Sequence, residues 1–276
     1  MSVSAHPPES STEPLAAPEA PLVRVLQTLR LSDPLRWLRA GWRDMAEARG
    51  IALFYGLCFW LMAVVLGAVF RNMPQYTMSF VSGCFLVGPF LTMGLYEASR
   101  RREQGLPQSL RASLTCWYKH LGSMGTLVLV VILLELMWGR ASLVVFAVFF
   151  NTGMPSTAGV LKAVFNPQNW EFIAVYALVG GVFAGLVFST CVVSIPMILD
   201  RDTDAITAGI ASIEVVAGRT GPMLVWGAVI VALVVGAILL PWSIGLLVVG
   251  PWLGHASWHA YRGSFAWQAS PLAPPA

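Results

Sequence analysis

The chain has 276 residues, of which 57% are hydrophobic and 11% carry a charge. Soluble domains carry about 25% charged residues, so the composition excludes an ordinary soluble protein. The formal net charge of +3 does not indicate nucleic-acid binding. The arginines and lysines flank apolar stretches, where such residues orient helices and contact anionic lipid headgroups.

The first segment, residues 1–21, is rich in Pro, Ser, Glu and Ala and has no aromatic residue. A segment of this composition cannot bury enough apolar surface to become ordered, so we expect a disordered tail. It lacks a basic start followed by an apolar core, so we expect no cleaved signal peptide.

Six apolar stretches follow, and each reaches the roughly 18 residues that a helix needs to cross a bilayer. They cover residues 51–70, 77–97, 122–149, 171–199, 222–240 and 242–261. The sequence therefore predicts an all-α, polytopic membrane domain over residues 22–265 with six transmembrane helices. A short C-terminal tail, residues 266–276, completes the chain.

The charges that flank these stretches predict the topology. Arg and Lys lie before the first stretch, between the second and third, between the fourth and fifth, and after the sixth. The other side carries only Arg71 and Lys162. Because cytoplasmic loops are enriched in these residues, we expect a bacterial inner-membrane protein with both termini in the cytoplasm.

A short amphipathic segment precedes each outward-going stretch. These segments begin near Asp33-Pro34, Ser109 and Asp204, residue types that favour helix starts. Their apolar stripes are Leu35, Leu38, Trp42 and Met45; Leu110, Leu114, Trp117 and Leu121; and Ile206, Ile210, Ile213 and Ala217. We expect three interfacial helices on the inner leaflet that turn into the membrane near Gly50, Gly122 and Gly221.

An internal repeat is indicated by a recurring string. Residues 87–91 read Val-Gly-Pro-Phe-Leu, and residues 249–253 read Val-Gly-Pro-Trp-Leu. The match continues to Arg100 against Arg262, which favours a repeated hairpin. The alternative is that Gly-Pro and a terminal Arg are common helix punctuation.

The third stretch is longer than a bilayer requires, about 42 Å at 1.5 Å per residue. We expect its outer part to extend beyond the membrane and to pack with the loop at 151–170. Glu135 lies near its middle, where an ionisable group costs about 2.5–3.5 kcal/mol and usually faces a cavity, a partner or a proton path. The alternative is a carboxylic acid hydrogen-bonded inside the bundle.

His255 and His259 are four residues apart and therefore share one helix face. Imidazoles at this spacing can ligate a metal or a haem iron, so haem or copper is a candidate cofactor. The repeat aligns Glu97 with His259, which suggests a carboxylate and an imidazole at the same depth. The alternative is that both histidines hydrogen-bond to neighbouring helices.

A charged cluster is expected at the inner ends of the second and fourth stretches. Asp200, Arg201 and Asp202 resemble the start of a calcium loop, but Ala205 and Ala211 replace the required Gly and Glu. We therefore expect an ion-pair network in which these residues meet Arg100, Arg101 and Arg102, while Asp204 caps the next helix.

Four strings resemble the motifs of a bacterial family of predicted integral membrane proteins, classed as a domain of unknown function. They are residues 40–44 (Ala-Gly-Trp-Arg-Asp), 94–103, 196–202 and 254–259. The resemblance covers about residues 30–262 and implies six spans. Some members carry a label that relates them to cytochrome c oxidase subunit I. This chain has four histidines, fewer than the six of that subunit, so the resemblance implies no established activity.

Enzymatic motifs such as G-x-S-x-G, H-E-x-x-H and a Walker A loop are absent from the sequence. We therefore expect a non-enzymatic ligand-binding or transport-type membrane protein with a cavity lined by Glu97, Glu135, His255 and His259. The alternative is an accessory or assembly factor of a respiratory oxidase that binds haem or copper through the two histidines. The expected partners are membrane lipids or respiratory-complex subunits, with no nucleic acid.

Overall fold

The computed structural model describes residues 22–73, 76–150 and 166–269. The expected N-terminal tail, most of the 151–170 loop and the last residues of the C-terminal tail lie outside these ranges. The long helices are α2 (Arg49–Asn72), α3 (Thr77–Glu103), α5 (Leu121–Phe149), α7 (Trp170–Cys191), α10 (Thr220–Leu239) and α11 (Leu246–Ser264). The shorter elements are β1 (Leu22–Leu26), α1 (Asp33–Glu47), α4 (Leu110–Thr115), η2 (Cys116–His120), η3 (Pro167–Asn169), α8 (Ser194–Arg201), α9 (Ala205–Gly218), η4 (Pro241–Ser243) and β2 (Phe265–Ala269).

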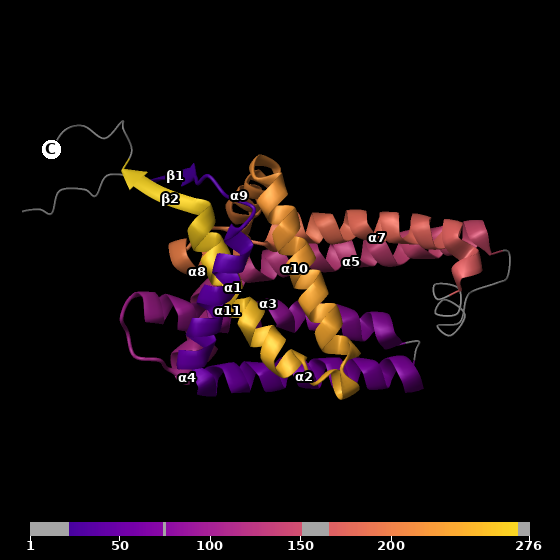
Figure 1. Cartoon of the computed structure of the whole chain (residues 1–276), viewed down its shortest axis with the longest axis horizontal. Helices are drawn as coiled ribbons and strands as arrows, with labels where there is room; N and C mark the ends of the chain where they lie inside the picture. The colour runs from indigo at the N-terminus through magenta and orange to yellow at the C-terminus, as the bar shows by residue number, and fades with distance from the viewer. Residues whose placement is uncertain (1–21, 74–75, 151–165, 270–276) are drawn as a thin grey trace, which may run out of the picture.

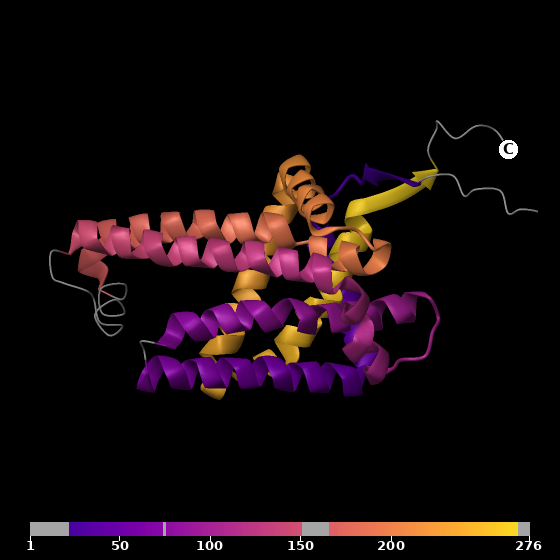
Figure 2. The same cartoon turned by 180° about the vertical axis from the view of Figure 1, so that it is seen from behind.

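The long helices form two side-by-side pairs and a crossing hairpin. Figures 1 and 2 show α2 beside α3 and α5 beside α7, all running along the long axis of the molecule. The α10–α11 hairpin crosses them at an angle, and α1 packs along α11. The expected all-α, polytopic architecture is confirmed.

Five helical stretches among the described residues are long and apolar enough to cross a membrane: 49–72, 77–103, 110–149, 167–201 and 220–239. They correspond to the first five expected spans. The expected sixth span is not among them. Its helix, α11, begins at Leu246, contains Pro251, and carries His255, His259 and Arg262 in its second half, which makes it too polar to qualify.

The strands were not expected from the sequence. β1 pairs antiparallel with β2, with the backbone of Leu22 opposite Ala269 and that of Leu26 opposite Phe265. This ribbon brings the two ends of the described chain together, and α1, α4, α8 and α9 lie at the same end of the bundle (Figure 1). We call it the ribbon end.

The three expected interfacial helices are present as α1, α4 with η2, and α9. Ser109 caps α4 by accepting a hydrogen bond from the Ala112 N–H, and Asp204 caps α9 through the N–H groups of Ile206 and Thr207. In α1 the N-cap is Ser32 and not the expected Asp33. The side chain of Asp33 accepts a hydrogen bond from the backbone N–H of Arg30.

Several large apolar residues of α1 and α9 face outward, although Trp37 and Val215 are buried in the core. Leu35 is 64% exposed and Ile206 is 69% exposed, whereas Trp37, Gly41 and Asp44 are the side of α1 that is buried. The buried side of α9 carries small residues such as Ala208 and Ser212. An apolar outer face and a small-residue inner face are typical of helices that contact lipid.

The core lies at the ribbon end. In α3 every residue from Met93 to Ser99 is buried, and the main hydrophobic cluster includes Trp226, Trp258 and Tyr261. Close backbone contacts occur where glycines remove the side chain. A Cβ atom on Gly41 would lie 2.5 Å from the backbone nitrogen of Ala256, and one on Gly56 would lie 2.2 Å from the carbonyl oxygen of Leu247.

At the opposite end, α5 and α7 reach beyond the other helices (Figure 2). This extension agrees with the length expected for the third span. Phe146 of α5 packs on Phe172 of α7 with ring centroids 5.8 Å apart, and Phe150 packs on the same ring at 5.0 Å. The expected packing against residues 151–165 lies outside the described residues.

Candidate functional site

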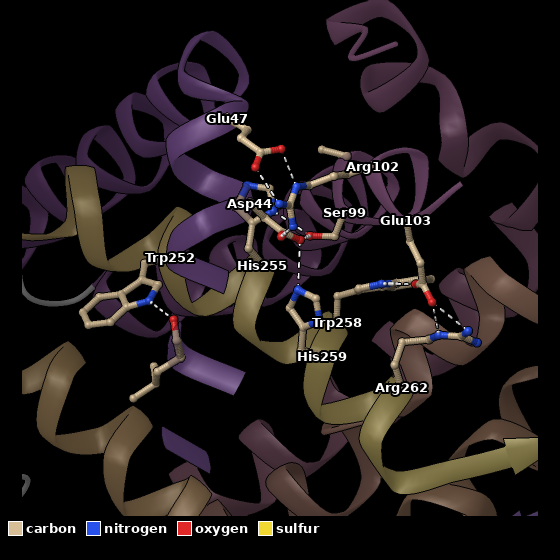
Figure 3. Close-up of polar contacts among 12 residues, drawn as sticks. Asp44, Glu47, Ser99, Arg102, Glu103, Trp252, His255, Trp258, His259 and Arg262 are labelled. Carbon is tan, nitrogen blue, oxygen red and sulfur yellow. Dashed lines mark hydrogen bonds and ion pairs between the residues drawn. The ribbon is translucent and has the colours of Figure 1, made fainter. Parts of the chain in front are cut away.

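The first candidate site is a buried polar cluster centred on Asp44, the last buried residue on the inner face of α1. Its side chain is 2% exposed. The carboxylate accepts hydrogen bonds from the Ser99 hydroxyl of α3 at 2.5 Å and contacts His259 Nε2 of α11 at 3.0 Å. Figure 3 shows these side chains converging from three helices. Asp44 therefore ties α1, α3 and α11 together.

Ser99 also lies 2.8 Å from Nδ1 of His255. The single hydroxyl proton of Ser99 is donated to Asp44, so Ser99 Oγ accepts the Nδ1–H of His255. Nε2 of His255 is then left as the nitrogen with the lone pair. This atom is buried and has no hydrogen-bond partner among the described residues.

The charge of Asp44 is balanced by Arg102. Arg102 Nη1 lies 2.5 Å from Asp44 Oδ1, and its Nε and Nη2 contact the two oxygens of the exposed Glu47 (Figure 3). Burial by itself raises the pKa of Asp44, but the hydrogen bonds from His259 and Ser99 together with the electrostatic interactions with His259 and His255 outweigh it and lower the pKa. Asp44 is therefore an ionised carboxylate at neutral pH.

The two histidines expected to ligate a metal or haem are both neighbours of this cluster. His259 contacts Asp44, and His255 contacts Ser99. Within the part of the chain that the structure describes, no group of three or more His, Cys, Asp or Glu side chains is arranged to hold a metal ion. Among the described residues, Nε2 of His255 is the one imidazole nitrogen that is buried without a hydrogen-bond partner.

Glu97 does not join the histidines. Its carboxylate is almost fully buried and pairs with Arg100 at 2.7 Å and with Arg101 at 3.7 Å, both on its own helix. The expectation that Glu97 and His259 line one cavity is not supported by these contacts.

The expected ion pairs between Arg100–Arg102 and Asp200–Asp202 are wrong. Asp200 instead contacts Arg201 at 3.2 Å, Arg262 at 3.7 Å and the Tyr261 hydroxyl at 2.8 Å. Asp202 ends α8 with a φ of 50° and contacts His120 Nδ1 at 3.1 Å. The reason is geometric: Arg100 and Arg101 have the closer partner Glu97 on their own helix, and Arg102 has Asp44 and Glu47 on α1.

The second candidate site surrounds Glu135, halfway along α5. Its side chain is buried, and Oε2 lies 2.8 Å from the Ser82 hydroxyl of α3. Oε1 is buried and has no hydrogen-bond partner within the described ranges of the chain. Glu135 lines a cavity of about 490 Å³ between α3, α5 and α7, whose other lining residues are Phe85, Leu134, Trp138, Gly180, Phe183, Ala184, Val187 and Phe188.

The two sites are far apart. Ser82 contacts Glu135 and Ser99 contacts His255, and both serines belong to α3. Seventeen residues of helix separate them, which corresponds to about 25 Å. The prediction of a single cavity lined by Glu97, Glu135 and the α11 histidines is therefore wrong. Glu135 lines a separate cavity.

Sequence reasoning missed Asp44, Ser99 and Ser82 as site residues. Asp44 and Ser99 lie inside the motif strings 40–44 and 94–103, and an acidic residue opposite the apolar stripe of α1 was a usable signal. Ser82 had no such signal, because a lone serine in an apolar helix does not reveal which neighbouring helix it faces.

The fold, with its five long apolar helical stretches among the described residues, defines the chain as a multi-pass integral membrane protein. Residues 76–200, a little under half of the chain, match the model of a family described as Predicted integral membrane protein (DUF2189). The resemblance expected from the motifs is thereby confirmed for this region, and the family description assigns no activity and mentions no oxidase. No curated protein and no solved structure matches the chain.

Proposed function

We propose that this protein is a non-enzymatic membrane protein of the ligand-binding or transport type, with its ligand bound at Glu135. One observation carries the proposal. A buried carboxylate at the middle of a membrane-spanning helix has one oxygen without a partner, and it lines a cavity of about 490 Å³. Cavities of about 300–1,000 Å³ with mostly apolar walls and few polar groups are typical of small-molecule sites.

The energetic cost of burying Glu135 favours a functional role over a packing role. An ionisable residue at the centre of a helix costs about 2.5–3.5 kcal/mol on insertion scales. Ser82 satisfies one oxygen only, so the neighbouring helices do not compensate this cost fully. A ligand that supplies a hydrogen-bond donor would complete the site.

The proposal includes a bacterial inner membrane with the ribbon end in the cytoplasm. The three arginines of α1, Arg111 of α4 and the three arginines at the inner end of α3 support this orientation, because positive residues accumulate on the cytoplasmic side. The pairing of β1 with β2 supports an even number of crossings. We therefore propose that α11 completes a sixth crossing in spite of its polar second half. The outward apolar faces of α1 and α9 support membrane lipids as partners.

The function is tested by purifying the wild type, Glu135→Gln and the control Glu171→Gln into lipid nanodiscs. Glu171 is an exposed carboxylate at the start of α7, outside the cavity. Small molecules that co-purify are identified by mass spectrometry. We expect a molecule that the wild type and Glu171→Gln retain and Glu135→Gln loses.

In parallel, dicyclohexylcarbodiimide, a lipophilic reagent for carboxylic acids, is expected to label Glu135. Identical co-purified molecules in all three proteins, together with an unreactive Glu135, would contradict the proposal.

A second candidate function is an accessory role for a respiratory oxidase, with haem or copper held by His255 and His259. The unpartnered Nε2 of His255 favours it. Its hydrogen-bonded Nδ1 also resembles the orientation that a ligating imidazole needs. The first measurement is the absorption spectrum and copper content of the purified protein. A Soret band or stoichiometric copper that disappears in His255→Ala would replace the first proposal by this one.

A further inference from the structure

We infer that the ligand of the Glu135 cavity is a hydrophobic amine in its protonated form. The inference rests on the proposed function of this site and adds the chemical class of the ligand. It follows from the hydrogen bonds that the site makes and from the one it lacks.

The hydrogen-bond balance depends on the protonation state of Glu135. Ser82 Oγ lies 2.8 Å from Glu135 Oε2 and 3.1 Å from the carbonyl oxygen of Met78. If Glu135 is ionised, Ser82 donates its proton to Oε2, and Oε1 is an acceptor without a donor among the described residues. A neutral Glu135 with its proton on Oε2 donates to Ser82 and also leaves Oε1 as an acceptor, whereas a proton on Oε1 would make this atom a donor without an acceptor.

An ionised Glu135, the state that a cationic ligand would pair with, therefore lacks a donor at Oε1, and the ligand has to supply it. The other residues that line the cavity provide no second acceptor side chain, and Trp138 is the only one with a side-chain N–H. A sugar or another polyhydroxylated solute would leave most of its own hydrogen bonds unmade here. An anion would meet a carboxylate, and a bare metal ion would find too few oxygen ligands.

The lining favours a cation among the possible donors. Four of the lining residues are aromatic, namely Phe85, Trp138, Phe183 and Phe188. The ring of Trp138 packs against Phe183 with centroids 6.0 Å apart. Aromatic faces attract ammonium groups, most strongly where water is excluded. An ammonium N–H paired with Glu135 also leaves no net charge at the middle of the span, which removes the main cost of burying either group alone.

The test uses three probes that share one hydrophobic body: N,N-dimethyl-4-phenylbutylamine, its N-methyl quaternary ammonium salt, and 4-phenylbutanol. The amine, protonated at neutral pH, carries charge and an N–H. The quaternary salt carries charge only, and the alcohol carries a neutral donor only. Binding to protein in nanodiscs is measured by calorimetry and by tryptophan fluorescence, with empty nanodiscs as the partition control.

We expect the amine to bind roughly tenfold or more tightly than the other two probes, as a charge-assisted hydrogen bond implies. Glu135→Gln is expected to remove this preference, Glu171→Gln to leave it unchanged, and Glu135→Asp to keep part of it. The Asp variant preserves the test if the Gln variant does not fold.

The outcomes separate this inference from the proposed function. If the alcohol binds as tightly as the amine and its binding depends on Glu135, the site stands and the amine class is wrong. The assignment of the ligand as an amine is also wrong in a second case. In that case no probe binds, but Glu135 reacts with dicyclohexylcarbodiimide and Glu135→Gln loses a co-purified molecule. If no probe binds and those two observations fail as well, the proposed function falls together with the inference.

Discussion

The carboxylate of Asp44 and the hydroxyl of Ser99 are 55 positions apart in the chain, yet their oxygens lie 2.5 Å apart in the interior of the bundle. This contact joins α1, which lies at the ribbon end, to the buried part of α3. Because Asp44 also meets Arg102 and His259, it is the charge on which the packing of three helices depends.

Asp44→Asn is expected to destabilise the protein strongly. The substitution removes the charge that accepts hydrogen bonds from Ser99, His259 and Arg102. Since hydrogen bonds to a charged group contribute about 1.5–3 kcal/mol and the side chain of Arg102 is one-third exposed, we expect a loss in that range. The matched control is Glu47→Gln, which removes the exposed partner of the same arginine and should have a much smaller effect. Thermal unfolding in detergent measures both variants. Equal losses in the two would show that Asp44 is not the structural charge we describe.

Acidification should remove the contribution of Asp44 to stability. Its pKa in the folded protein is lowered from 3.8, because hydrogen bonds from His259 and Ser99 outweigh the effect of burial. A lowered pKa means that the unfolded chain binds more protons, so the stabilisation is complete above the unfolded pKa and is lost as the pH falls through the folded pKa. The melting temperature of the wild type should therefore exceed that of Asp44→Asn by a constant amount from about pH 7 to pH 5 and converge with it below about pH 4. A difference that does not shrink on acidification would contradict this assignment.

Gly56→Ala should separate α2 from α11. A Cβ atom at this position would lie 2.2 Å from the Leu247 carbonyl oxygen, a backbone atom that cannot move aside alone. We expect a loss of about 1–3 kcal/mol, as for other overpacked sites. Gly67→Ala, on the same helix with no atom within 4 Å of the new Cβ, should cause no loss. Unfolding curves of the two variants decide the point, and a tolerated Gly56→Ala would mean that α2 and α11 do not pack this closely.

Reporter fusions should determine the number of crossings. A reporter after Gln104 is expected in the cytoplasm, and one after Met154, which lies outside the described residues, is expected in the periplasm. A reporter after Ala276 distinguishes the alternatives: cytoplasmic if α11 crosses the membrane, periplasmic if only the five apolar stretches cross. A periplasmic signal from this last fusion would refute the sixth crossing and place the two strands of the ribbon on opposite sides, which their pairing forbids.

Most of the long helices could be predicted from the sequence, but the fourth expected span, 171–199, is interrupted between the end of α7 at Cys191 and the start of α8 at Ser194. The third span was expected at 122–149, and α5 runs from Leu121 to Phe149. The caps at Ser109 and Asp204 were also recognisable, because a cap depends only on residues within one turn. α11 was harder, because its first half is apolar and its second half is packed against α1 and α3, where polar residues are tolerated.

The candidate sites could be predicted only in part. Glu135 was recognisable because a lone carboxylate in an apolar helix is costly wherever that helix packs. The contacts of Arg102 were not, because its partner Asp44 is 58 positions away and the choice among several acidic residues depends on how three helices are rotated. The ribbon was missed for a similar reason, since each strand has only five residues and its partner lies at the other end of the chain.

The sequence by itself determined where the chain is apolar, where its helices begin and end, and that a charge lies within the third span. These properties are sums of local free energies along the chain. Only the tertiary structure decided that Asp44 meets Ser99 and that Glu135 has a cavity separate from the histidines. Such contacts depend on the relative rotation and depth of whole helices, which small differences in packing determine and which no local pattern records.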